Sequence, residues 1–219
     1  MEFQSLLRRR LFGARWRWER LNNRLFDYYY GTRTHQETSL TSAGVAADQA
    51  RKGNDIYRPF WRREFVQSIN DAGIRPEQFV FVDIGSGKGK LLLLAAQLDF
   101  AEIIGVEYAP KLHEAAVDNI DRFKKRSRSA EVIVSVNANA LTWPLPSRPA
   151  LYFMYNPFDL ATTRAFFSRL DEHATQSRTP TVLIYGNLRG VSERAEAFEG
   201  AKTLMLKVSK PRYTIFSNL

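Results

Sequence analysis

One short segment constrains the fold of this chain more than any other. The apolar run Phe79–Val82 is followed by Asp83, by glycines at positions 85, 87 and 89, and then by the apolar segment Lys90–Leu98. A short apolar run bounded by a turn signal is typical of a buried strand, and the longer segment predicts a helix. Glycines allow a positive φ and a close ligand approach, and the N–H groups that open a helix can bind a carboxylate or phosphate. The segment therefore predicts a strand, a ligand-binding turn and a helix.

Further apolar segments follow at intervals that leave room for helices. Because strands that alternate with helices are joined by right-handed crossovers, they predict an α/β fold with a mostly parallel sheet. The last two strands are separated by only Ser209–Arg212, too short for a crossover, so they form an antiparallel hairpin. We expect further strands at Ile103–Val106, Val132–Val136, Leu151–Tyr155, Thr181–Tyr185, Thr203–Val208 and Tyr213–Ser217, and a helix at Pro110–Phe123.

The N-terminal region has a helical pattern. Apolar residues recur there at alternating spacings of four and three, with arginines on the other faces: Leu7, Leu11, Ala14, Trp18, Leu21 and Leu25. We expect an amphipathic helix whose apolar stripe packs on the protein's own core. Docking of that stripe on a membrane surface or a partner is the alternative.

Residues 26–54 are rich in Gly, Thr, Ser and other polar residues, and they predict a loop with a short helix. Pro59–Ala72 predicts a helix with Phe60, Phe65 and Ile69 facing inward, and Gly73 is its stop signal. These patterns divide the chain into a basic helical N-terminal extension or cap, residues 1–60, and a core, residues 61–219.

The net charge of +9 is concentrated in two clusters. Seven arginines fall between Arg8 and Arg24 against the single acid Glu19. A second cluster comprises Arg122, Lys124, Lys125, Arg126 and Arg128. Basic patches attract phosphate or acidic surfaces, so the arginine-rich N-terminus predicts an anionic partner, either nucleic acid or an acidic protein. A solvated basic face with no partner is the alternative.

Several kinds of site are disfavoured. The chain has no cysteine, and its histidines, His35, His113 and His173, are far apart, so we expect no disulfide and no metal site. No apolar run approaches the ~18 residues of a membrane span, and no secretory signal is recognisable. We expect a cytoplasmic protein. A mitochondrial presequence is the alternative, because acids are sparse before Asp27.

The Gly-rich turn departs from two familiar nucleotide motifs. A dinucleotide fingerprint would place its third glycine where Lys90 stands, and a P-loop needs Ser or Thr after its lysine, where Gly89 follows Lys88. Glu107 ends the next strand, 22 residues after Gly85, and an acid there can accept both hydroxyls of a ribose. An ordinary exposed glutamate is the alternative.

Four motifs in order resemble those of class I S-adenosylmethionine-dependent methyltransferases. They are Asp83–Gly89, Ile104–Glu114, Asn139-Ala140 and Tyr155–Phe158, and with the terminal hairpin the resemblance covers residues 79–219. It implies a Rossmann-like three-layer sandwich, a seven-strand sheet and S-adenosylmethionine as cofactor. Upstream, Tyr30–Thr34 and Tyr57–Pro59 resemble the front lobe of a bacterial group that is itself similar to non-SET protein-lysine methyltransferases.

The resemblance also implies roles for single residues. Asp83 would reach the cofactor's amino group, Glu107 its ribose hydroxyls, and Asn139, beside Ala140, its adenine amino group. Most relatives carry Asp at the position of Asn139, but Asn keeps a carbonyl acceptor. Gly85, Gly87 and Gly89 would leave room for the methionine portion. Tyr57 and Pro59 would close over the cofactor, with simple packing as the alternative. Independently of the resemblance, we expect Lys88 and Lys90 to be solvated.

The run Tyr155-Asn156-Pro157-Phe158 is similar to the Asn/Asp-Pro-Pro-aromatic motif of amino-group methyltransferases, although its second proline is missing. The resemblance implies that the Asn156 carbonyl and the backbone around Pro157 hold an amine's hydrogens and aim its lone pair. Phe158 would shape the acceptor pocket. Transfer of a methyl group to an amine of a protein, nucleic acid or small molecule follows as the expected activity, and the sequence does not indicate which acceptor is used.

Two other functions stay open. An aminopropyl transferase would need several acids near the acceptor, and only Asp159 follows Tyr155. A non-catalytic cofactor-binding module could dock on nucleic acid or another anionic partner through its arginines. The intact Asp83, glycines and Glu107 argue against such degeneration.

Overall fold

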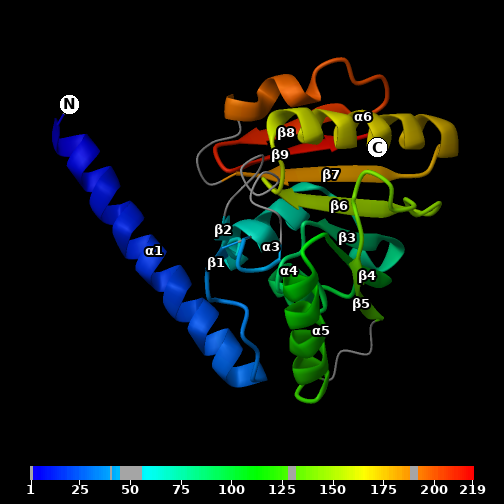
Figure 1. The fold of residues 1–219 in the computed structure, drawn as a ribbon. Helices are drawn as coiled ribbons and strands as arrows, with labels where there is room; N and C mark the ends of the chain where they lie inside the picture. The colour runs from blue at the N-terminus through cyan, green and yellow to red at the C-terminus, as the bar shows by residue number, and fades with distance from the viewer. Residues whose placement is uncertain (1, 40, 45–55, 128–131, 188–191) are drawn as a thin grey trace.

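The computed structural model describes residues 2–39, 41–44, 56–127, 132–187 and 192–219. The rest of the predicted loop 26–54, and Arg128 of the second basic cluster, lie outside these ranges. Figure 1 shows a twisted sheet covered by helices on both faces, and a long N-terminal helix that leans away from it.

The described residues form a seven-stranded sheet in the order β5-β4-β3-β6-β7-β9-β8. All neighbouring strands are parallel except β9, which pairs antiparallel with both β7 and β8. The predicted mostly parallel seven-strand sheet with a terminal hairpin is therefore confirmed. The strands are β3 Val80–Ile84, β4 Glu102–Glu107, β5 Ile133–Asn137, β6 Ala150–Tyr155, β7 Thr181–Gly186, β8 Met205–Lys210 and β9 Tyr213–Ser217.

Helices form the two outer layers. Those of one face are α3 Arg62–Asp71, α4 Lys90–Ala95 and α5 Pro110–Lys124, and those of the other are α6 Leu160–Ser177 and the 3₁₀ helix η2 Ser192–Phe198. A short 3₁₀ helix, η1 Pro76–Gln78, precedes β3, and the strands β1 Thr38–Ser39 and β2 Ile56–Tyr57 form a separate antiparallel pair. The three-layer arrangement agrees with the predicted sandwich.

The central strands are mostly apolar because both of their faces are covered, and Asp83 near the carboxyl end of β3 is a charged exception. In β3, Phe81 packs toward α3 and α4, while Val80, Val82 and Ile84 pack toward α6, and all are buried. Alternate side chains of a strand point to opposite faces, so a strand between two helix layers has no polar face.

The strand order reverses at β3 and β6, which are neighbours although two strands separate them in the chain. Ligands of open α/β sheets bind beyond the carboxyl ends of the strands at such a switch point. Asp83 in β3 and Asn156 after β6 lie at that edge.

The helix α1, Glu2–Tyr30, corrects one prediction. Trp18, Leu21 and Leu25 are 62%, 47% and 55% exposed, whereas Glu19 and Asn23 are buried. The prediction that the apolar stripe packs on the core is therefore wrong for these residues. Hydrophobic spacing alone does not say which face meets the core, and here a polar face does. The helix also continues through residues 26–30, into the segment where a loop with a short helix was expected.

The last turn of α1 attaches the helix to the core. The rings of Phe26 and Tyr30 lie 6.3 and 4.5 Å from the ring of Phe123 on α5. Arg126 donates hydrogen bonds to the carbonyl oxygens of Tyr28 and Tyr29, 3.2 and 2.9 Å away. A cation on these terminal carbonyls also favours the helix dipole. None of the described helices is long and apolar enough to cross a membrane.

A buried carboxylate joins α6 to the segment before β8. Asp171 accepts hydrogen bonds from the backbone N–H groups of Lys202, Thr203 and Leu204 at 2.8, 2.9 and 2.7 Å. Burial alone would raise the pKa of Asp171, but these bonds outweigh it and hold the pKa below its ordinary 3.8.

We predict that Asp171→Ala lowers the free energy of unfolding by about 3 kcal/mol near neutral pH, because it leaves buried N–H groups unpaired. Since the folded-state pKa is depressed, this stabilisation is present above the ordinary pKa and lost as the pH falls through the folded pKa. Urea unfolding at neutral and acid pH measures it. Glu172 is the next residue and is exposed, so Glu172→Ala should change the free energy of unfolding little. Equal decreases in the two variants would contradict the prediction.

Candidate active site

A cavity of about 350 Å³ opens at the carboxyl ends of β3, β4 and β6. Segments that are distant in the sequence meet there: the Gly-rich turn, the loops after β4, β5 and β6, and the residues after β2. Of the twelve predicted site residues, all except Gly89 line it. They are Tyr57, Asp83, Gly85, Gly87, Glu107, Asn139, Ala140, Tyr155, Asn156, Pro157 and Phe158.

Two glycines of the turn are required by both conformation and close contact. Gly85 has φ +76°, and a Cβ there would lie 2.5 Å from Pro157 Cβ. Gly87 has φ +55°, and a Cβ there would lie 2.2 Å from the ring of Tyr57. Gly89, at φ +80°, instead begins α4 against Ala116 of α5, so its contribution is to helix packing.

Glu107 organises the turn. One oxygen of its buried carboxylate accepts a 2.7 Å hydrogen bond from the Gly87 N–H, and the other accepts a 2.8 Å bond from the Ala109 N–H. Burial raises the pKa of Glu107, although the backbone N–H groups favour the ionised form. The Tyr108 N–H also donates to this carboxylate, which thus joins the turn after β3 to the loop after β4.

Asp83 also lines the cavity, but unlike Glu107 it receives no hydrogen bond from the described residues. Its side chain is 3% exposed. Burial, and then the charge of Glu107, raise the pKa of Asp83 well above its usual range. Because buried polar groups are normally paired, this carboxyl group is suited to a donor supplied by a ligand, and best to a cationic one.

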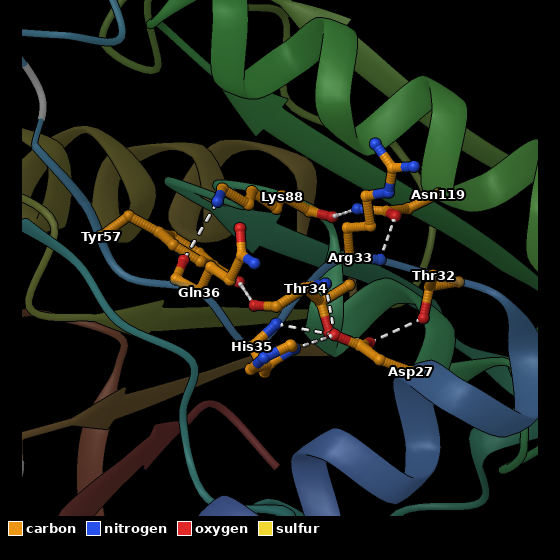
Figure 2. A network of polar contacts seen from close by, with 9 residues as sticks. All are labelled: Asp27, Thr32, Arg33, Thr34, His35, Gln36, Tyr57, Lys88 and Asn119. Carbon is orange, nitrogen blue, oxygen red and sulfur yellow. Dashed lines mark hydrogen bonds and ion pairs between the residues drawn. The ribbon is translucent and has the colours of Figure 1, made fainter.

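A polar network centred on Asp27, which we call the front-lobe network, lies beside Tyr57 of the cavity lining (Figure 2). The carboxylate of Asp27 accepts 2.7 Å bonds from both hydroxyls of Thr32 and Thr34 and from the Thr34 N–H, and it also contacts the His35 ring at 2.7 Å. Burial would raise the pKa of Asp27, but these hydrogen bonds lower it on balance. The ionised aspartate therefore fixes the segment that follows α1.

That segment is in turn bonded to the Gly-rich turn. Tyr57 donates to the Thr34 carbonyl at 3.0 Å, and Lys88 Nζ donates to the Gln36 carbonyl at 3.0 Å. Asn119 of α5 accepts from the Arg33 N–H at 2.7 Å and donates to the Lys88 carbonyl at 2.9 Å. Figure 2 shows these contacts beside those of Asp27, and the backbone of residues 33–36 joins the two groups. The Tyr57 ring lies against Gly87 and lines the cavity.

The segment after β6 has an unusual backbone. Asn156 has φ +43°, a left-handed conformation that Asn tolerates better than most residues. Its Oδ1 accepts a 2.8 Å hydrogen bond from the Tyr185 hydroxyl, which orients the amide. Asp159 caps the N-terminus of α6, because its Oδ1 accepts a 2.7 Å hydrogen bond from the Thr162 N–H. Its carboxylate therefore has a structural role.

Asn139 lines the cavity, and its Oδ1 accepts a 2.9 Å hydrogen bond from the Leu141 N–H. The side chain thus shapes its own turn, and its oxygen keeps a second lone pair. Ala140, next to it, is buried.

The expectation that Lys88 and Lys90 are solvated is wrong, since they are 9% and 2% exposed. Lys90 lines the cavity, and its Nζ lies 3.4 Å from the centroid of the Phe26 ring. Burial lowers the pKa of Lys90 to about 7. Sequence reasoning missed this lysine, although its place at the start of a run of leucines was a signal of burial.

No protein-family model and no curated protein matches this sequence. Solved structures do match its fold. A precorrin-6y C5,15-methyltransferase from Geobacter metallireducens is 17% identical, with a TM-score of 0.54 over 79% of this chain and 97% of that one. A SAM-dependent methyltransferase from Aquifex aeolicus is 10% identical, with a TM-score of 0.51 over 82% and 97%.

Magnesium protoporphyrin IX methyltransferase from Synechocystis, solved with bound SAM, is 12% identical, with a TM-score of 0.50 over 71% of this chain and 77% of that one. The chain has the fold of these methyltransferases. At such identities the likeness extends to the fold alone, and it does not identify an acceptor.

We predict that Lys90→Met stabilises the protein near neutral pH by on the order of 2 kcal/mol, because burial of the ammonium outweighs its attraction to the Phe26 ring. The pKa of Lys90 is depressed from 10.5 to about 7. The gain should therefore be largest at and below the folded pKa and shrink as the pH rises toward 10.5.

Thermal unfolding across this pH range measures the effect, with the exposed-lysine variant Lys125→Met as the matched control. A gain independent of pH, or equal in both variants, would contradict the prediction.

Proposed function

We propose that this protein is an S-adenosylmethionine-dependent methyltransferase that transfers a methyl group to an amine nitrogen. The observation that carries the proposal is the buried pair Asp83 and Glu107 beside a cavity at the switch point of a methyltransferase-type sheet. The acceptor amine belongs to a protein, a nucleic acid or a small molecule, and the resemblance of Tyr30–Thr34 and Tyr57–Pro59 to the front lobe of protein-lysine methyltransferase relatives favours a protein lysine.

The residues present fit this cofactor. Asp83, which has no donor among the described residues, suits a protonated amino group. Glu107 lines the cavity as a hydrogen-bond acceptor for the ribose hydroxyls, and Asn139 keeps a lone pair for an adenine amino group. A cavity of about 350 Å³ is in the range of small-ligand sites.

When bound, the cofactor supplies a methyl group on a positively charged sulfur. The chain's own contribution is to hold and aim the acceptor. Asn156, oriented by Tyr185, would accept a hydrogen bond from the amine, and Pro157 and Phe158 would form walls of the acceptor pocket. Such positioning can supply ~7–11 kcal/mol of the barrier reduction.

The division into a basic extension of residues 1–60 and a methyltransferase core of residues 61–219 is part of the proposal. Two contacts support a functional link between the two, because Arg33 and Gln36 of the extension bond to Asn119 and Lys88 of the core. Tyr57, which also lies in the extension, lines the cavity. A non-catalytic cofactor-binding module is the alternative, and it would bind the cofactor without turnover.

We predict that Asp83→Asn weakens binding of S-adenosylhomocysteine by roughly 100-fold, since it removes a charge-assisted hydrogen bond in a buried site. In the native protein, affinity should rise with pH as Asp83 ionises through its raised pKa, while the ligand's amino group is still protonated. Calorimetric titration at several pH values measures both effects.

The same substitution should raise the melting temperature of the ligand-free protein near neutral pH, because a neutral amide replaces a buried carboxylate without a protein donor. Opposite signs for affinity and stability distinguish this role from simple misfolding. Unchanged affinity in Asp83→Asn would refute the assignment of Asp83 to the amino group.

We predict that Asn156→Gly lowers kcat by ~100-fold or more and leaves cofactor affinity nearly unchanged, because the lost interaction matters mainly in the transition state. Glycine is the chosen replacement because it retains the left-handed backbone at φ +43°. The measurement is single-turnover methyl transfer with an acceptor found by labelling of a fractionated lysate.

Tyr185→Phe is the matched control: it keeps Asn156 but removes the hydroxyl that orients it, so an intermediate loss is expected. Normal turnover in Asn156→Gly would exclude amine positioning by this residue. Equal losses of binding and turnover would make its role structural.

A further inference from the structure

An apolar stripe runs along the outer face of α1. Trp18, Leu21, Leu25 and Tyr28 are 62%, 47%, 55% and 85% exposed, and they are separated by three, four and three residues. This spacing puts them on one face of a helix. In the sequence, Leu7, Leu11 and Ala14 continue the same spacing toward the N-terminus.

The outward direction of the stripe is determined by the opposite face. Glu19, Asn23 and Asp27 are buried, and Asp27 is held by the front-lobe network. Figure 1 shows the rest of α1 leaning away from the sheet and its covering helices. Neither the core nor any other described helix can therefore cover the stripe without the loss of these buried contacts.

Positive charge borders the stripe. Arg17, Arg20 and Arg24 are exposed beside it. In the sequence, Arg10 precedes Arg17 by seven residues, a spacing that puts the two on the same side of the stripe. Arg8 and Arg15 follow Leu7 and Ala14 directly, and this position puts them on the opposite side of the stripe. The only acid between residues 8 and 24 is Glu19, whose side chain is buried.

An apolar stripe bordered by arginines disfavours two kinds of binding partner for α1. A second copy paired along the stripe would bring its bordering arginines against those of the first, because positions beside such a seam face one another. A nucleic acid would neutralise the arginines through its phosphates but would leave the tryptophan and leucine side chains in water.

We propose that α1 docks in the plane of an anionic membrane surface. The apolar stripe enters the boundary of the acyl chains, and the bordering arginines extend to the lipid phosphates. Trp18 and Tyr28 are of the aromatic types that prefer this interface. The helix lies on the bilayer and does not cross it, consistent with its many charges. This inference is independent of the methyl-transfer proposal.

Flotation of the full chain with vesicles tests the proposal. We expect binding to vesicles of phosphatidylcholine with phosphatidylglycerol, little binding to phosphatidylcholine alone, and a decline with added salt. Leu21→Glu/Leu25→Glu should weaken binding at least ~10-fold, because two apolar side chains no longer enter the bilayer. Arg17→Gln/Arg24→Gln should weaken binding and flatten its salt dependence.

The matched control is Met205→Glu/Leu206→Glu. These residues are 51% and 56% exposed on the edge strand β8, so the control adds the same charge to a similar apolar surface elsewhere. It should bind as the unmodified chain does. Circular dichroism and melting temperature verify that each variant is folded.

A second measurement covers the case in which the Leu21→Glu/Leu25→Glu variant misfolds. Brominated acyl chains should quench tryptophan emission of the bound native chain, and less so in Trp18→Phe. Vesicle binding unaffected by the leucine changes, or equal on neutral vesicles, would overturn the proposal. So would a dimer that the leucine changes dissociate while vesicles do not bind, or binding confined to RNA and dependent on the arginines alone.

Discussion

The carboxylate of Glu107 is the interaction on which the rest of the site depends. By accepting from the Gly87 and Ala109 N–H groups, it fixes the turn after β3 relative to the loop after β4. Gly85 then lies against Pro157, and Gly87 lies against the ring of Tyr57. Loops from four different parts of the chain thereby meet at one carboxylate-anchored turn. A side chain at either glycine would separate them, since the contacts are closer than a Cβ allows.

The N-terminal segment is joined to this turn by ionised and amide side chains rather than by apolar packing alone. Asp27 orders the backbone that follows α1, and Asn119 and Lys88 connect that backbone to α5 and the Gly-rich turn. An aspartate with several donors is ionised and geometrically demanding, so it specifies one arrangement of the lobe. The same contacts orient α1, because Asp27 belongs to its last turn. The outward stripe of α1 and the position of Tyr57 at the cavity are consequences of one network.

The sheet and the Gly-rich turn were predictable because their signals are local. Each central strand is a short apolar run, and the turn is a fixed pattern of acid and glycines. Gly89 has the expected glycine conformation, but its contact with Ala116 could be known only from the packing of α5 on α4. The prediction that the α1 stripe faces inward was wrong for a related reason. Periodicity identifies an apolar face, but Asp27 and its partners determine which face of the helix turns toward the core. Lys90 resembled a surface lysine because Phe26, which covers it, lies 64 residues earlier in the chain. The left-handed Asn156 and its bond to Tyr185 likewise depend on the neighbouring strand β7.

The charges around the cavity have a further consequence for ligand binding. Burial shifts the pKa of Asp83 and Glu107 upward and that of Lys90 downward, so each group is displaced toward its neutral form. Asp83 and Glu107 also oppose one another's ionisation. A cation bound at Asp83 would reverse that balance, because it favours the charged state of both carboxylates at once. Binding of a cationic ligand and loss of protons from the pair are therefore linked. A bound cation would lower the pKa of both carboxyl groups. The same buried carboxyl pair that is costly to ionise in the protein alone would therefore favour a positively charged ligand.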